Sequence, residues 1–397
     1  MFSRKRIPPS VLMMILAVML SACASGTRSD GVATARAPSP QRVKIGVGAP
    51  TSGQIAELGA GIVNGARMAI DEANADGIKL DGADVVFELV VEDDRADPRT
   101  GPDAARRLIE RGVVAVVGHL NSGISIPASA LYDRARIPMV TPASSNPRLT
   151  QQGLSSVFRI VGHDGTQGEG IAEFIALGLK RTSFAVVEDG TTYGRVVCEP
   201  VVDSAKRRYA LSPRLTTTYS ALETSPKSVA DRIVQSGADA VVYCGMGDDA
   251  VHLFAALRAQ GSKAVFIGSD GLMSTEVVSA MRELGEVYAS SSDPVWDRSD
   301  AAQDFEQRYR RRFGLDVSAY SATSYDATRV LIAAMRAGNS TNSAGLADKI
   351  HSIAFKGVTG SIEFSASGER LATPVTLLKL TDGKWAPAWR SGAALMR

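Results

Sequence analysis

The chain has 397 residues, a formal net charge of +2, 45% hydrophobic residues and 22% charged residues. This composition is typical of a folded protein and excludes collagen-like, coiled-coil and disordered chains. The near-neutral charge argues against nucleic-acid binding, and three cysteines are too few for a disulfide-stapled scaffold. The length predicts two or three domains.

The first segment has the pattern of an export signal. A basic triplet at residues 4–6 precedes an apolar run, Val11–Leu20, that is too short to span a bilayer. Small residues lead into Cys23, as in a bacterial lipoprotein signal, where the cysteine is lipidated and becomes the first residue. The alternative is a plain secretory signal in which Cys23 is incidental. We predict a lipoprotein signal peptide at residues 1–22 and a flexible tether at residues 23–41.

Beyond the tether, short β-rich runs alternate with longer stretches of helical period. Continuous apolar strands separated by helices predict parallel sheets covered on both faces. About seven such units exceed one ordinary sheet, so we predict an α/β fold of two doubly wound parallel-sheet lobes. The expected strands are Val43–Val47, Val85–Val91, Val113–Gly118, Ile137–Thr141, Ser183–Val187, Ala240–Tyr243 and Val265–Gly268. The expected helices include Gly61–Asn74, Pro102–Arg111, Val196–Arg208 and Val251–Gln260.

Hydroxyl-rich turns follow two expected strands of the first half, where ligands bind in such sheets. Ser122 lies near the N-cap of an expected helix, Ile124–Arg134, and Ser144 and Ser145 lie in the turn after the next strand. Two such turns on neighbouring strands would converge on a small anion, and helix N-termini with hydroxyls suit a carboxylate. The alternative is that these serines only cap helices.

An acidic and aromatic pair follows strands of the second half. Asp270 comes after Val265–Gly268, and Tyr193 comes after Ser183–Val187. If the first lobe binds an anion and faces this pair, the protein would be a receptor for a zwitterion. Asp270 before a glycine is equally typical of a simple turn.

From about Val43 to about Trp385, the chain carries an ordered set of short motifs and resembles the leucine/isoleucine/valine-binding proteins of bacterial ABC importers. The resemblance implies the type I periplasmic binding-protein fold, in which two lobes joined by a three-stranded hinge close on an amino acid. It implies one lobe at residues 42–160 and 290–362 and another at residues 161–289 and 363–397. The motifs are Asn64-Gly65-Ala66, Asp93-Asp94, Val117-Gly118-His119, Thr141-Pro142-Ala143-Ser144-Ser145-Asn146-Pro147, Tyr193-Gly194 and Gly268-Ser269-Asp270-Gly271.

The resemblance also implies roles for individual residues. Ser122 and Ser145 match the hydroxyls that hold the ligand α-carboxylate, and Ser144 matches a residue whose backbone contributes there. Tyr193 matches a tyrosine that lines the second lobe. Asp270 stands where the branched-chain binders have a glutamate for the α-ammonium group.

Two pocket positions depart from the family pattern. Leu58 stands where the family has an aromatic residue over the ligand side chain, and Met246 stands at a pocket tyrosine. The enterobacterial disulfide is absent, because its positions are Ala96 and Asn121 here. Recognition of an amino-acid backbone is implied, whereas the identity of the side chain is not.

Enzyme, cofactor and metal motifs are not recognised. Gly46-Val47-Gly48 follows a strand, but Thr51 stands where a dinucleotide fingerprint needs its third glycine. The four histidines lie far apart in the sequence, with no metalloprotease or nucleophile-elbow pattern. We therefore predict no catalytic residue, no cofactor and no metal.

Two further features have structural interpretations. Phe305, Tyr309 and Phe313 recur at helical spacing within an arginine-rich run, which predicts a helix with one buried stripe and no nucleic-acid contact. Cys198 and Cys244 are expected to be reduced, mostly buried thiols, since sequence spacing says nothing about their distance.

Together these features predict an exported, lipid-anchored solute-binding protein on the periplasmic side of the cell envelope. It would capture an amino acid, branched-chain-like, by hinge closure and deliver it to an ABC permease. The alternative is a ligand-sensing or regulatory envelope lipoprotein of the same fold that is not coupled to transport.

Overall fold

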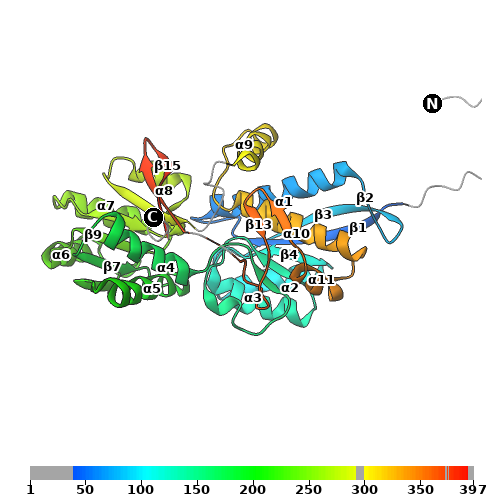
Figure 1. Cartoon of the computed structure of the whole chain (residues 1–397), viewed down its shortest axis with the longest axis horizontal. Coiled ribbons are helices and arrows are strands. Elements are labelled where there is room, and N and C mark those ends of the chain that lie inside the picture. The colour runs from blue at the N-terminus through cyan, green and yellow to red at the C-terminus, as the bar shows by residue number, and fades with distance from the viewer. Residues whose placement is uncertain (1–38, 292–298, 372, 374, 392–397) are drawn as a thin grey trace, which may run out of the picture. The chain divides into compact units, whose positions relative to one another are not determined.

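The computed structural model describes residues 39–291, 299–371, 373 and 375–391. The predicted signal peptide, Cys23 and most of the predicted tether therefore lie outside the described residues. The described chain is an α/β fold with two sheets that are mainly parallel (Figure 1). The prediction of two doubly wound lobes is confirmed.

The first sheet has six strands within the described residues, in the order β2-β3-β1-β4-β5-β6. β1 pairs in parallel with both β3 and β4, whereas β2 runs antiparallel to β3 at one edge. The strands are β1 (Gln41–Ala49), β2 (Ile78–Leu80), β3 (Ala83–Asp93), β4 (Ala115–Gly118), β5 (Met139–Thr141) and β6 (Val157–Arg159). The helices of this lobe are α1 (Ala56–Asp76), α2 (Gly101–Glu110), α3 (Ser122–Arg134), α9 (Asp300–Phe313), α10 (Ser321–Gly338) and α11 (Leu346–His351).

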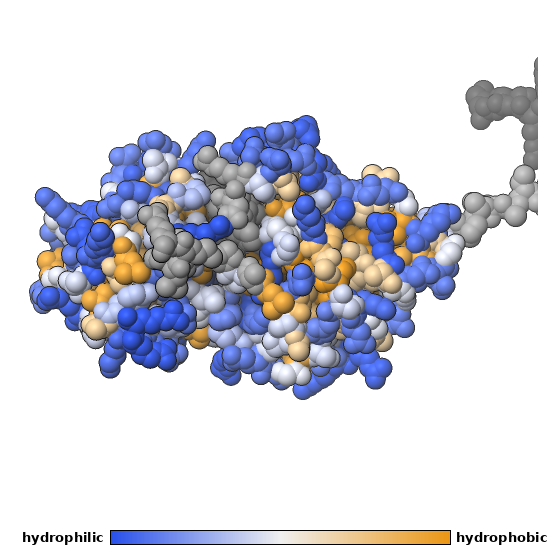
Figure 2. All heavy atoms as spheres, in the orientation of Figure 1, coloured by the Kyte–Doolittle hydropathy of each residue, from blue (hydrophilic) through white to orange (hydrophobic). Residues whose placement is uncertain are grey.

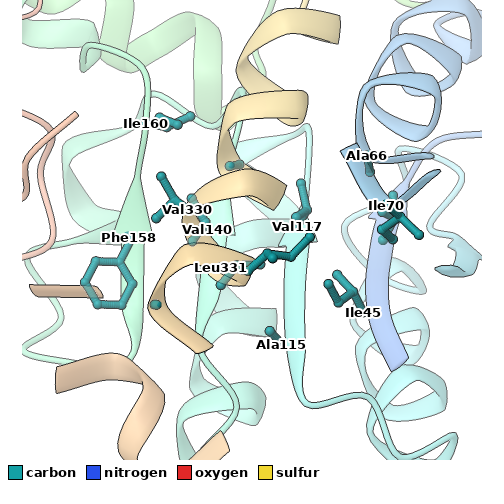
Figure 3. Packing of buried hydrophobic residues seen from close by; sticks show 14 of the residues in the cluster. Ile45, Ala66, Ile70, Ala115, Val117, Val140, Phe158, Ile160, Val330 and Leu331 are labelled. Carbon is teal, nitrogen blue, oxygen red and sulfur yellow. The ribbon is translucent and has the colours of Figure 1, made fainter. Parts of the chain in front are cut away.

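Alternate residues of β4 face two different layers of helices. Ala115 and Val117 pack into a cluster with residues of α1 and α10, as Figure 3 shows from close by. Val116 packs on the opposite face with residues of α2 and α3. Because both faces are covered, the central strands are apolar without interruption, which is the pattern that predicted them.

The second sheet has seven strands among the described residues, in the order β15-β14-β11-β10-β9-β7-β8. Residues of α4 and α5 pack on one face, and residues of α6, α7 and α8 pack on the other. The strands are β7 (Phe184–Glu188), β8 (Leu215–Thr218), β9 (Ala240–Cys244), β10 (Val265–Gly268), β11 (Val287–Ser291), β14 (Thr376–Thr381) and β15 (Lys384–Arg390). The helices are α4 (Asp164–Glu173), α5 (Thr192–Tyr209), α6 (Pro226–Ser236), α7 (Asp248–Ala259) and α8 (Thr275–Met281).

Antiparallel hairpins at the sheet edges were not predicted. β2–β3 and β14–β15 turn through Asp81-Gly82 and Asp382-Gly383. All four residues have positive φ, at 48° and 76° in the first turn and 51° and 73° in the second. Asp-Gly in this conformation is a preferred two-residue hairpin connection, so a local sequence signal for both turns exists. A third hairpin joins β12 (Phe355–Gly357) to β13 (Gly360–Ile362).

The chain passes between described elements of the two lobes after β6, after β11 and after β13. α9 returns to the first lobe, where Phe305 and Tyr309 pack with Met68 of α1. The predicted buried stripe of this helix is therefore confirmed. The predicted lobe boundaries stay a prediction.

The visible face of the molecule carries hydrophilic side chains with hydrophobic ones between them (Figure 2). None of the described helices combines the length and the apolar character needed to cross a bilayer.

The prediction that Cys198 and Cys244 are reduced thiols is wrong. They form a disulfide that joins α5 to the end of β9, with a Cα–Cα distance of 5.7 Å. The prediction of burial holds, since both residues are at most 6% exposed. The pairing could not be foreseen because it depends on how α5 packs against β9, and the two residues are 46 positions apart.

We expect the Cys198→Ser/Cys244→Ser double variant to unfold with a free energy about 3–4 kcal/mol lower than the wild type, because this loop is no longer closed in the unfolded chain. Urea denaturation followed by circular dichroism measures the change. A reducing agent should destabilise the wild type by a similar amount and leave the double variant unaffected. Equal stability of the two proteins under oxidising conditions would contradict the expectation.

Candidate functional site

The first half of the candidate site begins with the turn after β4. The buried His119 ring lies between two partners, with Nδ1 2.7 Å from Asp94 Oδ2 and Nε2 3.0 Å from the Tyr132 hydroxyl. The His119 carbonyl accepts hydrogen bonds from Thr141 Oγ1 and Ser144 Oγ, each at 3.0 Å. These bonds tie the turn after β4 to the turn after β5, the neighbouring parallel strand.

Ser122 and Ser145 lie in these two joined turns. Ser122 is the first residue of α3, since Asn121 keeps an extended backbone and acts as the N-cap. The Ser122 hydroxyl accepts a hydrogen bond from the backbone N–H of Asn146 at 3.4 Å. Ser122 and Ser145 are 2% and 1% exposed. The structure therefore brings the two hydroxyl-bearing turns together, and the role of these serines as ligand contacts stays a prediction.

Ser144 shapes the second turn through its own donors. Its hydroxyl donates to the Leu120 carbonyl at 2.9 Å as well as to that of His119, and its amide donates to Thr141 Oγ1 at 2.9 Å. Both donors are thus used inside the protein. The predicted backbone contribution of Ser144 to ligand binding stays a prediction.

A buried arginine holds the turn after β5. Arg159, at the end of β6, is fully buried, and its Nη1 donates to the carbonyls of Ser144 at 3.2 Å and Asn146 at 2.7 Å. Its Nε donates to Glu369 Oε2 at 3.0 Å, and its Nη2 donates to Thr150 Oγ1 at 3.0 Å. A buried guanidinium requires both a counter-charge and partners for its N–H groups. Glu369 lies in the passage from β13 to β14, so the turn is coupled to a connection between the lobes.

A second arginine extends this network. Arg370 donates to the Ile160 carbonyl at 3.1 Å and to the Thr359 carbonyl at 2.6 Å. The buried Asp326 carboxylate on α10 accepts from the Thr359 amide at 2.7 Å and hydroxyl at 2.6 Å. Burial raises the pKa of Asp326, and the hydrogen bonds from Thr359 and the Arg370 charge oppose this shift. The first and third passages between the lobes are therefore held by one set of buried polar groups.

The second half of the candidate site centres on Asp270, which follows β10 and is 5% exposed. Its Oδ1 accepts a hydrogen bond from the Tyr193 hydroxyl at 2.5 Å, and its Oδ2 accepts from Gln167 Nε2 at 3.2 Å. Gln167 in turn accepts from the Ser290 hydroxyl at 2.9 Å. The structure thus joins Tyr193 and Asp270 as a pair, and it adds Gln167, which the sequence analysis missed because it lies within α4 and not at a strand end.

Burial sets the protonation of this pair. It raises the pKa of Asp270 to about 6, although the hydrogen bonds from Tyr193 and Gln167 act in the opposite direction. Burial and the Asp270 charge raise the pKa of Tyr193 well above its usual value. Tyr193 is therefore the donor and Asp270 the acceptor at neutral pH.

Asp164, the first residue of α4, is a further acidic group that the sequence analysis missed. It is fully buried, and its amide donates to the Ser145 carbonyl at 2.8 Å. The Ser145 side chain acts on its carboxylate as a hydrogen-bond donor. Burial raises its pKa to about 8; the Asp270 charge adds to this shift, whereas the Ser145 side chain and the Arg159 charge oppose it. Asp164 is therefore near both halves of the site.

Leu58 and Met246 occupy hydrophobic surroundings. Leu58 is 1% exposed in the core of the first lobe, and Met246 packs against that core and against a cluster of the second lobe.

Tyr320, which precedes α10, lines a cavity of about 430 Å³ together with Asp270. The sequence analysis missed Tyr320. The predicted contacts of Leu58 and Met246 with a ligand stay predictions. The other apolar walls of the cavity include Val161, Met273, Val278, Val317 and Trp385.

Two polar contacts join the halves directly. Asn146 Nδ2 donates to the Thr192 carbonyl at 3.4 Å, next to Tyr193, and Asn121 Nδ2 contacts Met246 Sδ at 3.6 Å. One half offers uncharged donors and a helix N-terminus, which suit an anion, and the other offers carboxylates, which suit a cation. Among the described residues no group of three or more His, Cys, Asp or Glu side chains could hold a metal ion.

Known proteins are similar to this chain in sequence and in architecture. A family model described as a periplasmic binding protein matches residues 42–384. Leu/Ile/Val-binding protein homolog 1 of Brucella abortus (strain 2308) is 31% identical over 352 residues, which cover 86% of this chain and 92% of that protein.

Solved structures agree in fold. The leucine-binding protein LivK of Thermotoga maritima has a TM-score of 0.80 and 23% identity, covering 88% of this chain and 98% of that one. LivJ of Streptococcus pneumoniae in complex with isoleucine has a TM-score of 0.79 and 23% identity, covering 88% and 99%.

We expect Arg159→Met to lower the free energy of unfolding by about 3–5 kcal/mol, because the mostly buried Glu369 loses its counter-charge and two carbonyls of the turn lose their donor. Urea denaturation measures the loss. The control is Arg106→Met, since Arg106 forms an exposed ion pair with Asp103 on α2. That variant should change stability by less than about 1 kcal/mol. Equal losses in the two variants would contradict a special role for Arg159.

Proposed function

Because the chain belongs to the periplasmic binding protein family, we propose that it captures an amino acid outside the cytoplasm and delivers it to an ABC permease. Membership of this family makes it a solute-binding protein and not an enzyme. Its fold is that of the type I periplasmic binding proteins. The relative from Brucella abortus is named for leucine, isoleucine and valine, and LivJ was solved with isoleucine. These names support a branched-chain or similar amino acid as the substrate class.

The pairing of an uncharged half-site with an acidic half-site is the observation that carries this proposal. Ser122 and Ser145, with the N-terminus of α3, hold the α-carboxylate through hydroxyls and backbone amides. Asp270, oriented by Tyr193, accepts hydrogen bonds from the α-ammonium group. Both charges of a zwitterion are then satisfied without a buried cationic side chain next to the ammonium group.

Closure of the lobes follows from the origin of the two half-sites. The serines follow strands of the first sheet, and Asp270 and Tyr193 follow strands of the second sheet. A zwitterion therefore makes its full set of contacts only when the lobes meet. A ligand shifts such an equilibrium only by its preference for the closed state, and these contacts supply that preference.

The side chain of the ligand is the part that the cavity beside Asp270 accommodates. Its walls combine apolar residues with charged ones, which include Glu306, Arg310, Asp316 and Lys384, and its volume is about 430 Å³. Burial of apolar side-chain surface there favours leucine-like residues at about 25 cal/mol per Å² of area removed from water.

A thermal-shift screen of the anchor-free protein against the twenty L-amino acids tests the proposal, because a ligand bound by the native state raises the Tm. We expect leucine, isoleucine or valine to raise the Tm and their N-acetylated forms to have no effect. If no L-amino acid raises the Tm, the amino-acid assignment falls.

Asp270→Asn should weaken binding of the selected amino acid about 10- to 100-fold in titration calorimetry, because a charged hydrogen bond to the ammonium group is lost. Asp203→Asn is the matched control, since Asp203 is exposed on α5 and pairs with Arg207. Its affinity should equal that of the wild type. Unchanged affinity of Asp270→Asn would remove Asp270 from the site.

We also propose that Cys23 carries a lipid anchor, which the basic triplet, the apolar run and the small residues before Cys23 support. Cells grown with labelled palmitate should label the wild-type protein in the membrane fraction. Cys23→Ala should lose the label and leave that fraction, whereas the Cys198→Ser/Cys244→Ser variant should keep the label. Label on Cys23→Ala would contradict the anchor.

A further inference from the structure

The His119 side chain connects three parts of the first lobe from inside. The ring is fully buried, with Nδ1 against the Asp94 carboxylate, which follows β3, and Nε2 against the Tyr132 hydroxyl of α3. It also lies against β1, because a Cβ on Gly48 would collide with the ring. The ring is therefore held from β1, from the end of β3 and from α3.

Only one orientation of the ring serves both of its polar partners. Asp94 Oδ1 accepts a hydrogen bond from the backbone N–H of Ala96 at 3.0 Å, and Asp94 Oδ2 is 2.7 Å from His119 Nδ1. Burial and the Asp94 charge raise the pKa of Tyr132 well above its usual value, so Tyr132 keeps its hydroxyl proton. A rotated ring would leave two buried polar groups without partners, which is unfavourable.

The backbone of His119 joins the two hydroxyl-bearing turns. Its carbonyl accepts hydrogen bonds from Ser125 Oγ of α3 at 3.2 Å, from Thr141 Oγ1 at the end of β5 at 3.0 Å and from Ser144 Oγ at 3.0 Å. Thr141 Oγ1 in turn accepts from the backbone N–H of Ser144 at 2.9 Å. The position of this one carbonyl therefore sets the spacing between the turn after β4 and the turn after β5.

We propose that His119 is a positioning residue of the uncharged half-site: its ring, held by Asp94 and Tyr132, fixes the carbonyl that spaces the two turns for the ligand's α-carboxylate. This inference rests on the proposed function, because it assumes that these turns bind a carboxylate. Donors that are held in place before the ligand arrives bind it more tightly, since less ordering is needed on binding. A looser ring should therefore weaken binding at the carboxylate end of the ligand.

Titration calorimetry with L-leucine tests the inference in the wild type, in Tyr132→Phe and in Tyr325→Phe. Tyr132→Phe removes only the hydroxyl at Nε2, whereas a change of His119 itself would leave the buried Asp94 without its partner. Tyr325 is the matched control, since it is also buried and its hydroxyl donates to Glu72 of α1 at 2.6 Å. Tyr132→Phe should bind leucine about 10-fold more weakly, which corresponds to one lost hydrogen bond. Tyr325→Phe should bind like the wild type, although both variants lose stability in urea denaturation.

The carboxyl carbon of the ligand separates positioning from general loosening of the fold. With leucine labelled at its carboxyl carbon and its methyl carbons, Tyr132→Phe should shift the bound carboxyl resonance in carbon NMR. The methyl resonances should match those of the wild type, and Tyr325→Phe should shift neither.

Wild-type affinity of Tyr132→Phe for leucine would overturn the inference, as would equal weakening in the two variants. Weaker binding with an unchanged carboxyl resonance would assign Tyr132 a structural role and overturn it as well. If the wild type bound no L-amino acid, the proposed function and this inference would fall together, whereas the other outcomes leave the proposed function intact.

Discussion

The ion pair between the buried Arg159 and the mostly buried Glu369 is the interaction on which the rest of the structure depends. A guanidinium removed from water is stable only when its charge is balanced and its N–H groups have acceptors. Arg159 meets this requirement with Glu369, with Thr150 and with two carbonyls of the turn after β5. The same bonds therefore define the turn that presents Ser145 and attach it to a connection between the lobes.

The candidate site extends from this support. The first lobe supplies neutral donors, and the second supplies the Asp270 carboxylate held by Tyr193 and Gln167. In the proposed function, this division of charge selects a zwitterion, since each end of the ligand meets groups of suitable polarity. The disulfide of Cys198 contributes to the same region, because it fixes α5, which carries Tyr193, to the end of β9, shortly before Met246.

Much of the fold could be predicted from local patterns. The seven expected strands are present among the described residues, because strands covered on both faces must be apolar without interruption. Short and edge strands such as β2 and β15 were missed because they are only partly apolar, although the Asp-Gly turns beside them carry a local signal. Strand ends also predicted Ser122, Ser145, Tyr193 and Asp270 as site residues, since the topology of parallel sheets directs such positions to one edge.

The sequence by itself determined the alternation of strands and helices, the two-lobed α/β class and the polar turns after the strands, because each depends on neighbours along the chain. Only the tertiary structure decided which distant groups meet. Arg159 and Glu369 are 210 residues apart in the sequence. Cys198 and Cys244, which we expected to be reduced thiols, form a disulfide. Asp164 lies near Asp270, although several helices and strands separate the two residues along the chain. Such contacts depend on the packing of every element between the partners, and no local pattern encodes that distance.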